Sequence, residues 1–323
     1  MLHRNVMRAL AGAAAILLAP HVFAQAFPSR PVRLVVPYAP GGGVDTVARA
    51  MAQELGAGLG GSVVVENRPG ANSIIGSDLV AKSPADGHVL LITVGTHYAM
   101  PFLAKNVSYD PVADFTPVTV VGRAPQVLAV PSSLPVNNVA EFIEHARRQA
   151  GKMSFATAGS GTSQHLGGEL MNVMAKLDMA HVPYKGGGPA LNDLVGQQVP
   201  SAILILSNVL PHARSGKVRL LGVIESSRAK AAPEVPTVGE TLNGFAVPDT
   251  WIGVLGPARM PAAVLSRLDG AITAAANLPA VRTRLDAAGF ELGIVNAQDF
   301  AKLALDATRA YRRITADAKI APE

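Results

Sequence analysis

Short apolar runs alternate with amphipathic stretches along most of this chain. Residues 34–36 (LVV) form a compact, mostly β-branched run that is typical of a buried strand. Asp45 or Thr46 is placed to act as the N-cap of a helix. Beyond them, apolar residues recur every four positions, as on one helical face: Val47, Met51 and Leu55. Three glycines at positions 41–43 separate the two elements, so the stretch predicts a strand, a glycine turn and a helix.

The same unit recurs three times. Strands are expected near residues 63, 153 and 180, and each leads through a glycine-bearing turn into a helical pattern. The turns are PGAN at 69–72, GSGT at 159–162 and GGG at 186–188. Strands that alternate with helices predict parallel pairing with crossover helices. In such sheets ligands bind beyond the carboxyl ends of the strands, where these turns lie.

The spacing of the units predicts two lobes. Two units precede residue 100 and two lie within 150–195, and segments rich in Val and Pro, expected as extended connections, follow each pair at 115–136 and 245–261. A helical tail over 263–318 is expected to return to the first lobe. We therefore predict one lobe from residues 27–125 and 248–323 and a second from 126–247. Their glycine turns would face one another across a cleft and approach when the hinge closes.

Glycine turns that precede helices favour an anion as the ligand. Glycine lets the backbone take positive φ and come close to a bound group. The first helical turn also presents free N–H groups and the positive end of the helix dipole. A single turn of this kind is better explained as a tight connection with no ligand, so the inference depends on the repetition.

The N-terminus predicts export. Arg4 and Arg8 precede the apolar stretch ALAGAAAILLAP, and an A-x-A site ends at Ala26, which together indicate a signal peptide over residues 1–26, cleaved after Ala26 or Ala24. The formal net charge of +5 falls to +3 once the two arginines are removed. The scattered charges argue against a nucleic-acid partner. The chain has no cysteine, and its histidines lack metal-ligand spacing, so no metal and no cofactor are expected.

Five stretches follow one another in a characteristic order. They are PSRPVRLVVPYAPGGGVDTVARAMAQEL, VVVENRPGANSIIGSDLVAKSPADGHVLL, FATAGSGTSQHLGGELM, HVPYKGGGPALNDLVGQQV and SGKVRLLGV. In this order and spacing they resemble the Bug family, the extracytoplasmic solute receptors of tripartite tricarboxylate transporters. The resemblance extends from the signal peptide to the C-terminal helices.

The resemblance implies an α/β, two-lobed periplasmic binding protein fold of type II. Each lobe would be a mixed, mostly parallel sheet flanked by helices, and two extended crossings would form the hinge. It further implies a periplasmic monomer that binds a small carboxylate in the interlobe cleft, without an obligatory arginine clamp. The implied protein partners are the integral-membrane permease subunits of a tripartite tricarboxylate transporter. One departure, in GGGPALNDL after Gly187, bears on the distal end of the pocket.

The cleft residues that the resemblance implies come from both lobes. The first lobe supplies the loops 38–45 and 69–73 and a strand end near residue 93, and the second supplies the loop 159–165 and the turn after residue 184. The expected ligand-binding residues are Tyr38, Gly41, Gly42, Gly43, Asp45, Ala71, Asn72, Thr93, Ser160, Gly161, Thr162, His165 and Tyr184.

Asp45 has a second interpretation, and two further residues near the expected cleft and hinge, Lys185 and Trp251, need one as well. Asp45 would repel a carboxylate, which favours helix capping or support of the loop over direct contact. Lys185 is equally consistent with a charge for a distal carboxylate and with a solvated side chain. Trp251 is expected to pack in the core beside the hinge.

Two other classes of function stay open at this point. A secreted hydrolase would use Ser160 or Thr162 as the nucleophile and His165 as its base, although Ala158 stands where a G-x-S-x-G elbow requires glycine. A sensing or scavenging receptor without a permease would share the fold and the site. Aliphatic di- or tricarboxylates, amino acids and aromatic acids all fit the sequence as ligands.

Overall fold

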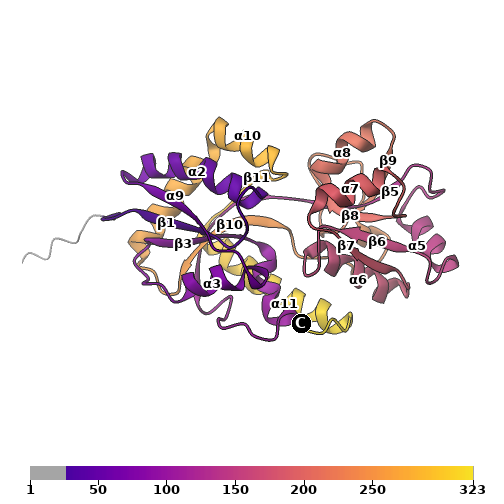
Figure 1. The fold of residues 1–323 in the computed structure, drawn as a ribbon, viewed down its shortest axis with the longest axis horizontal. Coiled ribbons are helices and arrows are strands. Elements are labelled where there is room, and N and C mark those ends of the chain that lie inside the picture. Colours follow the sequence, from indigo (N-terminus) through magenta and orange to yellow (C-terminus); the bar gives the residue numbers. More distant parts are fainter. Residues whose placement is uncertain (1–26, 323) are drawn as a thin grey trace, which may run out of the picture.

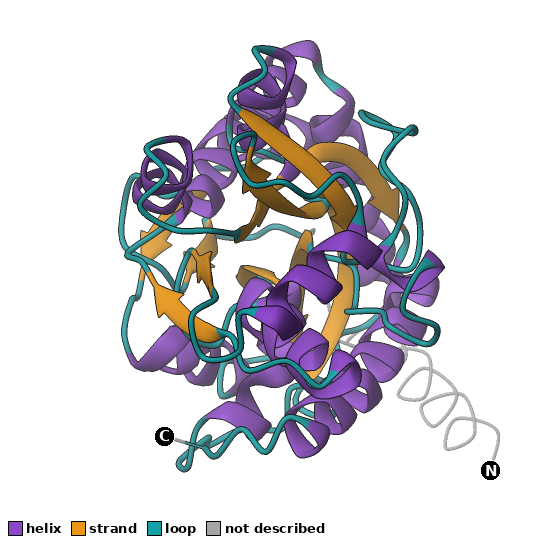
Figure 2. Ribbon diagram, turned by 90° about the vertical axis from the view of Figure 1, so that its right-hand side faces the viewer, coloured by secondary structure: helices purple, strands orange, loops and turns teal. Residues whose placement is uncertain are grey.

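Two β-sheets, each covered by helices, organise residues 27–322 of this computed structural model (Figures 1 and 2). The expected signal peptide lies outside these described residues. Within residues 27–322, no helix combines the length and the apolar character that a membrane span requires. We refer to the part built on the six-stranded sheet as lobe 1 and to the part built on the five-stranded sheet as lobe 2.

The sheet of lobe 1 is mixed. Four of its strands run in one direction, and β10 and β11 run against them. In spatial order the strands are β11 (Glu291–Val295), β4 (Phe115–Arg123), β10 (Trp251–Pro257), β3 (Val89–Val94), β1 (Val32–Val36) and β2 (Val63–Asn67).

The sheet of lobe 2 has the same character. Four of its five strands share one direction, and β5 is antiparallel to both of its neighbours. In spatial order the strands are β7 (Ala180–Pro183), β6 (Ser154–Thr157), β8 (Ala202–Ile205), β5 (Gln126–Pro131) and β9 (Val218–Val223). The expectation of two mixed, mostly parallel sheets is therefore confirmed.

Helices cover both sheets. Lobe 1 carries α2 (Gly43–Leu59), η1 (Ala71–Ser73), α3 (Ile74–Ala81), η2 (Gly95–Ala99), α4 (Met100–Leu103), α9 (Ala262–Asn277), α10 (Pro279–Ala287) and α11 (Ala297–Asp317). Lobe 2 carries α5 (Val139–Arg148), α6 (Ser163–Ala175), α7 (Gly187–Val195), α8 (Leu206–Arg214) and η3 (Val238–Glu240). The predicted inner face of α2 is fully buried, at Val47, Met51 and Leu55.

Each of the two segments rich in Val and Pro contains one of the crossings between the lobes, as expected, but many of its residues form strands of the sheets and not a free connection. Segment 115–136 contains β4 and β5, and β10 lies in the middle of the lobe 1 sheet between β3 and β4. Sheet pairing satisfies the backbone hydrogen bonds that buried β-branched segments would otherwise leave unmet. Within residues 27–322, the chain therefore passes between the lobes in two short crossings, residues 124–125 and 248–250. The crossings contact each other directly, because Ala124 N–H donates to Thr250 O at 2.8 Å.

The C-terminal tail returns to lobe 1, as expected, but with an additional strand. Helix α9 packs on α2, and β11 pairs with β4 at the edge of the sheet. Helix α11 packs against β4 and also reaches α6 of lobe 2. Trp251, at the start of β10, is fully buried, and its ring lies edge-on to Phe300 with centroids 4.8 Å apart.

Candidate functional site

The glycine turns of each lobe lie at one edge of its sheet. Strands β2, β1 and β3 are parallel neighbours, so the turns that follow them share the edge at which β4 leaves the sheet. In lobe 2, β6, β7 and β8 end where β5 begins, because β5 is antiparallel to β8. Both sets of turns therefore lie at the edges that the crossings join.

Helix α2 begins three or four residues earlier than the N-cap prediction, Asp45 or Thr46, places it. Its first residue is Gly43 and its N-cap is Gly42, so neither Asp45 nor Thr46 is the cap. Asp45 instead occupies the third helical position, where an acidic side chain also suits the dipole. Since Gly42 offers no capping oxygen, the first amides of α2 lack an intrahelical acceptor. All three glycines of the turn, Gly41 included, are exposed.

Asp45 fixes the shape of this turn. The residue is 3% exposed, and its carboxylate accepts hydrogen bonds from Gly41 N–H, Asn67 Nδ2 and Arg49 Nε, each at 2.9 Å. Burial alone would raise the pKa of Asp45, but these three hydrogen bonds and the charge of Arg49 outweigh it and lower the pKa. The carboxylate is thus ionised and fully engaged within the protein. This geometry corresponds to support of the loop, one of the two roles that the sequence left open.

Asp45→Asn is expected to lower the free energy of unfolding by about 1–3 kcal/mol, because the buried amide has one acceptor oxygen where the carboxylate has two and cannot accept from all three donors. Arg49→Met is the matched control. The Arg49 side chain is 54% exposed, so its ion pair contributes less than about 1 kcal/mol. Urea unfolding of both variants measures the difference. Equal losses would show that the ion pair with Arg49, and not the hydrogen bonds from Gly41 N–H and Asn67 Nδ2, holds the turn.

Tyr38 and Thr93 meet beneath the turn. The Tyr38 hydroxyl lies 3.1 Å from Thr93 Oγ1, and Asn67 Nδ2 donates to Tyr38 O at 3.2 Å. Burial raises the pKa of Tyr38, and hydrogen bonds with Thr93 and Ser73 counter it in part. Tyr38 is half-buried, while Thr93 is buried completely. The turn after β1 is therefore tied both to β2 and to the end of β3.

The turn after β2 holds three successive residues in a left-handed conformation. Ala71, Asn72 and Ser73 have φ values of 46°, 51° and 79°. Each non-glycine residue in this region costs roughly 1–2 kcal/mol relative to its preferred conformation. Ala71 and Asn72 are exposed. Strain of this kind is typical of ligand-binding loops, where the surrounding fold maintains it.

The turn after β6 in lobe 2 is capped by a hydroxyl. Thr162 is the N-cap of α6: its Oγ1 accepts from His165 N–H at 3.3 Å and donates to Gly159 O at 2.7 Å. Gly161 N–H donates to His165 Nδ1 at 3.2 Å. Ser160 is exposed at the tip of the turn.

A second histidine stacks on His165. The rings of His165 and His181 lie 4.0 Å apart, and the His181 Nε2 atom lies 2.7 Å from Thr157 Oγ1. Burial, with a smaller contribution from His165, lowers the pKa of His181 to about 4. His181 is therefore neutral near pH 7. Sequence reasoning did not identify His181, because it is one strand away and no spacing motif connects it to His165.

These contacts bear on the hydrolase alternative. In a Ser/His pair the imidazole nitrogen must accept the hydroxyl proton. Here His165 Nδ1 accepts from the Gly161 amide, and the Thr162 hydroxyl donates to a backbone carbonyl. Both groups serve the conformation of the turn.

The turn after β7 places Tyr184 beside the end of β6. Its amide donates to Thr157 O at 3.1 Å, which aligns it with β6. The hydroxyl donates to Asp193 Oδ2 at 2.5 Å, and this hydrogen bond raises the pKa of Tyr184 to about 12. The Tyr184 hydroxyl is thus turned toward α7. Lys185 is exposed.

The lobes approach each other beside these turns. A Cβ atom added at Gly161 of lobe 2 would lie 3.6 Å from Leu103 of lobe 1. Ser207 Oγ, in α8, lies 3.4 Å from Gly289 O, and Gly289 connects α10 to β11. The turns from the two lobes thus lie close to points of contact between the lobes.

A polar network at the hinge was not foreseen from the sequence. The Gln126 side chain donates to Ser163 Oγ at 2.7 Å and to Thr250 Oγ1 at 2.5 Å, and all three residues come from different parts of the chain. Both carboxyl oxygens of Glu225 accept from Gln126 N–H, at 3.1 and 3.2 Å. Ser163 directly follows Thr162, so this network joins the turn after β6 to both crossings.

Two α/β lobes, two short crossings and facing glycine turns define a two-lobed solute-binding protein. Comparison with known proteins gives the family. Residues 47–319 match the tripartite tricarboxylate transporter family receptor, and the chain belongs to this family. The resemblance inferred from the five motifs is confirmed.

Individual relatives agree with this assignment. A UPF0065 protein encoded in the tcbD-tcbE intergenic region of Pseudomonas sp. strain P51 is 40% identical over 88% of this chain and 86% of its own. Rpa4515 of R. palustris, solved with adipate, is 32% identical with a TM-score of 0.76, over 92% of this chain and 100% of its own. MatC from Rhodopseudomonas palustris, solved with malate, is 32% identical with a TM-score of 0.72, over 89% and 99%.

Proposed function

We propose that this receptor binds a small carboxylate between the glycine turns of its two lobes and closes around it. The observation that carries the proposal is the N-terminus of α2. Its N-cap has no side-chain hydrogen bond to the first-turn amides, Gly42 and Gly43 are exposed, and the buried Asp45 holds the Gly41 amide in place. Such a terminus attracts negative charge. The proposed ligand contacts are the thirteen residues named from the sequence, with Asp45 acting through the turn.

Aliphatic dicarboxylates are the ligand class we favour. Two relatives with comparable folds were solved with adipate and malate. The turn after β6, with the Ser160 hydroxyl at its tip, offers hydrogen-bond donors for a second carboxylate from lobe 2. Hydrogen bonds to a charged group contribute about 1.5–3 kcal/mol each, so about four of them support a micromolar dissociation constant after ordering costs.

The cellular role we propose is delivery of this carboxylate to a permease. Membership of the family implies a periplasmic location. In our proposal the signal peptide over 1–26 is removed, and lobes formed by 27–125 with 248–323 and by 126–247 make up a monomer. Integral-membrane permease subunits accept the closed, loaded form. The protein binds its ligand without chemical change, in keeping with the hydrogen bonds that engage His165 and Thr162.

A thermal-shift screen tests the proposal. Mature protein is unfolded and refolded to remove co-purified ligand, then mixed with mono-, di- and tricarboxylates, amino acids and aromatic acids, with adipate and malate included. A compound at 100 times its dissociation constant should stabilise the fold by about 2.7 kcal/mol and raise the Tm by several degrees. Calorimetry then measures the affinity. If no compound of the panel raises the Tm, the result would count against carboxylate binding.

A further inference from the structure

Strand β8 ends at the same edge of its sheet as β6 and β7, but it leads into its helix without a glycine turn. Its last residue, Ile205, is half-buried, and the run 202–206 that connects β8 to α8 is entirely apolar. The amide of Leu206 donates to Pro125 O of the first crossing at 2.8 Å. The end of β8 therefore presents an apolar surface at the edge where the turns after β6 and β7 lie.

Ile205 faces lobe 1 close to the turn after β1. A Cβ atom added at Gly289, in the turn between α10 and β11, would lie 3.3 Å from Ile205 Cγ2. The two neighbours of Gly289 pack on the turn after β1. A Cβ atom added at Gly43 would lie 3.4 Å from Ala288 O and 3.7 Å from Phe290 Cε2. The side chain of Ile205 is therefore separated from the N-terminus of α2 by one short turn of lobe 1.

The residues on either side of Ile205 connect it to both lobes. A Cβ atom added at Gly187, in the turn after β7, would lie 3.9 Å from Leu204 Cδ2. Ser207 Oγ donates to Gly289 O at 3.4 Å. Ile205 is thus placed between the turn after β7 and the turn after β1, and a ligand held by these turns would lie next to its side chain.

The acidic side chains near the turns have partners within the protein. Asp45 accepts three hydrogen bonds, as described above. Asp193 accepts from the Tyr184 hydroxyl at 2.5 Å, and Glu169 accepts from Asn172 Nδ2 at 3.3 Å. A ligand ammonium group would have to compete with these donors to obtain a counter-charge.

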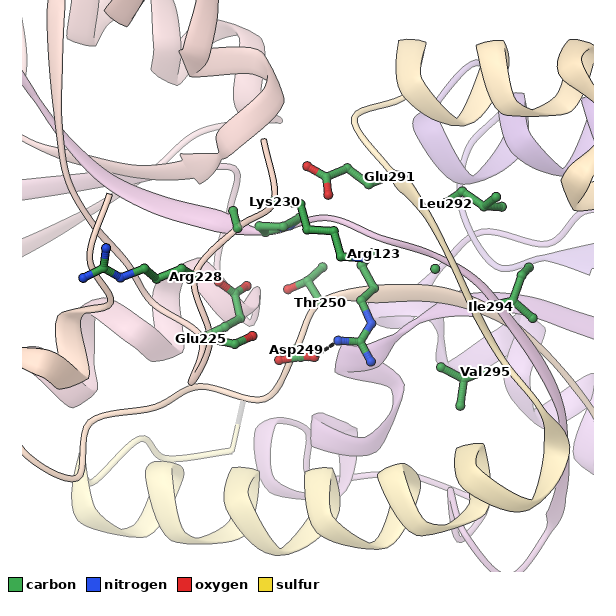
Figure 3. A pocket seen from close by; sticks show the side chains of 14 residues that line it. Arg123, Glu225, Arg228, Lys230, Asp249, Thr250, Glu291, Leu292, Ile294 and Val295 are labelled. Atoms are coloured by element: carbon green, nitrogen blue, oxygen red, sulfur yellow. Dashed lines mark hydrogen bonds and ion pairs between the residues drawn. The ribbon is translucent and has the colours of Figure 1, made fainter. Parts of the chain in front are cut away.

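The charged groups at the hinge line a separate cavity of about 310 Å³, where the two crossings meet (Figure 3). Arg123, Glu225, Lys230 and Glu291 contribute to its walls. Among the residues that the structure describes, its lining includes neither Ile205 nor any member of the glycine turns. We therefore assign these charges no contact with a ligand held at the turns.

We propose that Ile205 is a specificity-determining residue, which selects carboxylates whose carbon chain bears no hydroxyl or ammonium group. The inference rests on the proposed function, because it takes the glycine turns as the ligand site. A hydroxyl or ammonium group that faces Ile205 would lose its water without gaining a hydrogen-bond partner, which is unfavourable. An apolar wall discriminates against an added hydroxyl by about 100-fold at most.

Matched pairs of acids test the inference. Succinate, malate and aspartate share one chain length and differ by a hydroxyl or an ammonium group, as do adipate and 2-aminoadipate. Calorimetry should show that the unsubstituted acid of each series binds about 10- to 100-fold more tightly than its substituted counterparts. Equal affinities within both series would overturn the inference and leave the proposed function intact. If no acid of either series binds, the proposed function is refuted and this inference with it.

Two variants of nearly identical shape then assign the preference to one side chain. Ile205→Val and Ile205→Thr leave the same space, but only threonine offers a hydroxyl. Ile205→Thr should narrow the preference for succinate over malate at least about five-fold, whereas Ile205→Val should keep it. Circular dichroism compares the Tm of the two variants, so that a loss of fold is recognised.

Asn208 is the polar side chain to exclude. It is exposed, and its Oδ1 would lie 3.6 Å from a Cβ atom added at Gly289. Asn208→Leu should leave the preference for succinate over malate unchanged. A change of preference confined to Asn208→Leu, or an equal change in Ile205→Val and Ile205→Thr, would overturn the role of the apolar side chain of Ile205.

Discussion

Gly42→Val is expected to weaken carboxylate binding by more than 100-fold while the fold stays intact. A valine side chain at the N-cap of α2 would occupy the space in front of the first helical amides, where we place the anion. The backbone itself accepts the change. Gly42 has φ −74° and ψ 169°, and an added Cβ would meet only Ala39 O at 3.7 Å, an ordinary contact. A 100-fold loss corresponds to about 2.7 kcal/mol of binding free energy.

Two other glycine-to-valine variants show why Gly42 is the informative position. Gly270→Val changes an exposed helical glycine with no atom within 4 Å of the added Cβ, so binding should be unaffected. Gly41→Val is the wrong probe, because Gly41 has φ 86° and a valine there would strain the turn itself. Calorimetry gives the affinity and circular dichroism the Tm. Unchanged affinity in Gly42→Val would refute the assignment of the turn after β1 to the ligand.

The strand–turn–helix units are predictable because their signals are local. The run at 34–36 and the spacing of residues 47, 51 and 55 lie within one window, and the structure buries all of them. The start of α2 is less predictable, because aspartate suits both the N-cap and the third helical position. Only the contact between Asp45 and the Gly41 amide distinguishes these two positions.

The strand pairing and the polar contacts at the hinge could not be predicted from the sequence, because the residues involved are distant along the chain. Segments 115–136 and 245–261 have a composition that fits both a connection and a buried strand. Which one forms depends on pairing between β10 and β4, more than 120 residues apart. Gln126, Ser163 and Thr250 are ordinary polar residues whose spacing follows no motif, and only the folded hinge brings them together.

Glu225→Gln is expected to stabilise the protein at pH 8 and to remove part of its pH dependence. Glu225 is 4% exposed, and burial raises its pKa from 4.5 to about 8, with a further increase from Asp249 and an opposing effect of hydrogen bonds from Gln126 N–H and Thr250 N–H. Arg123 and Tyr311 also lie in this environment, the former paired with Asp249. The carboxyl is therefore mostly protonated in the folded protein near neutral pH.

The direction of the effect follows from proton binding. Below about pH 4.5 both the folded and the unfolded chain carry the Glu225 proton, so the group leaves stability unchanged. Between about pH 4.5 and 8 the unfolded chain loses this proton while the folded chain keeps it, so stability falls as the pH rises. Glutamine keeps the shape and the acceptor oxygen but does not titrate. The variant should gain about 2–4 kcal/mol over the unmodified protein at pH 8 and little at pH 4.5.

Urea unfolding at pH 4.5, 6.5 and 8 measures this difference, with Glu144→Gln as the control for the same change at an exposed site. The control should follow the unmodified protein at all three values. A Glu225→Gln protein that loses stability at pH 8 would mean that the folded hinge holds the carboxylate ionised. The hydrogen bonds from the crossings would then outweigh burial, and charge, not a neutral acceptor, would join the two crossings at this point.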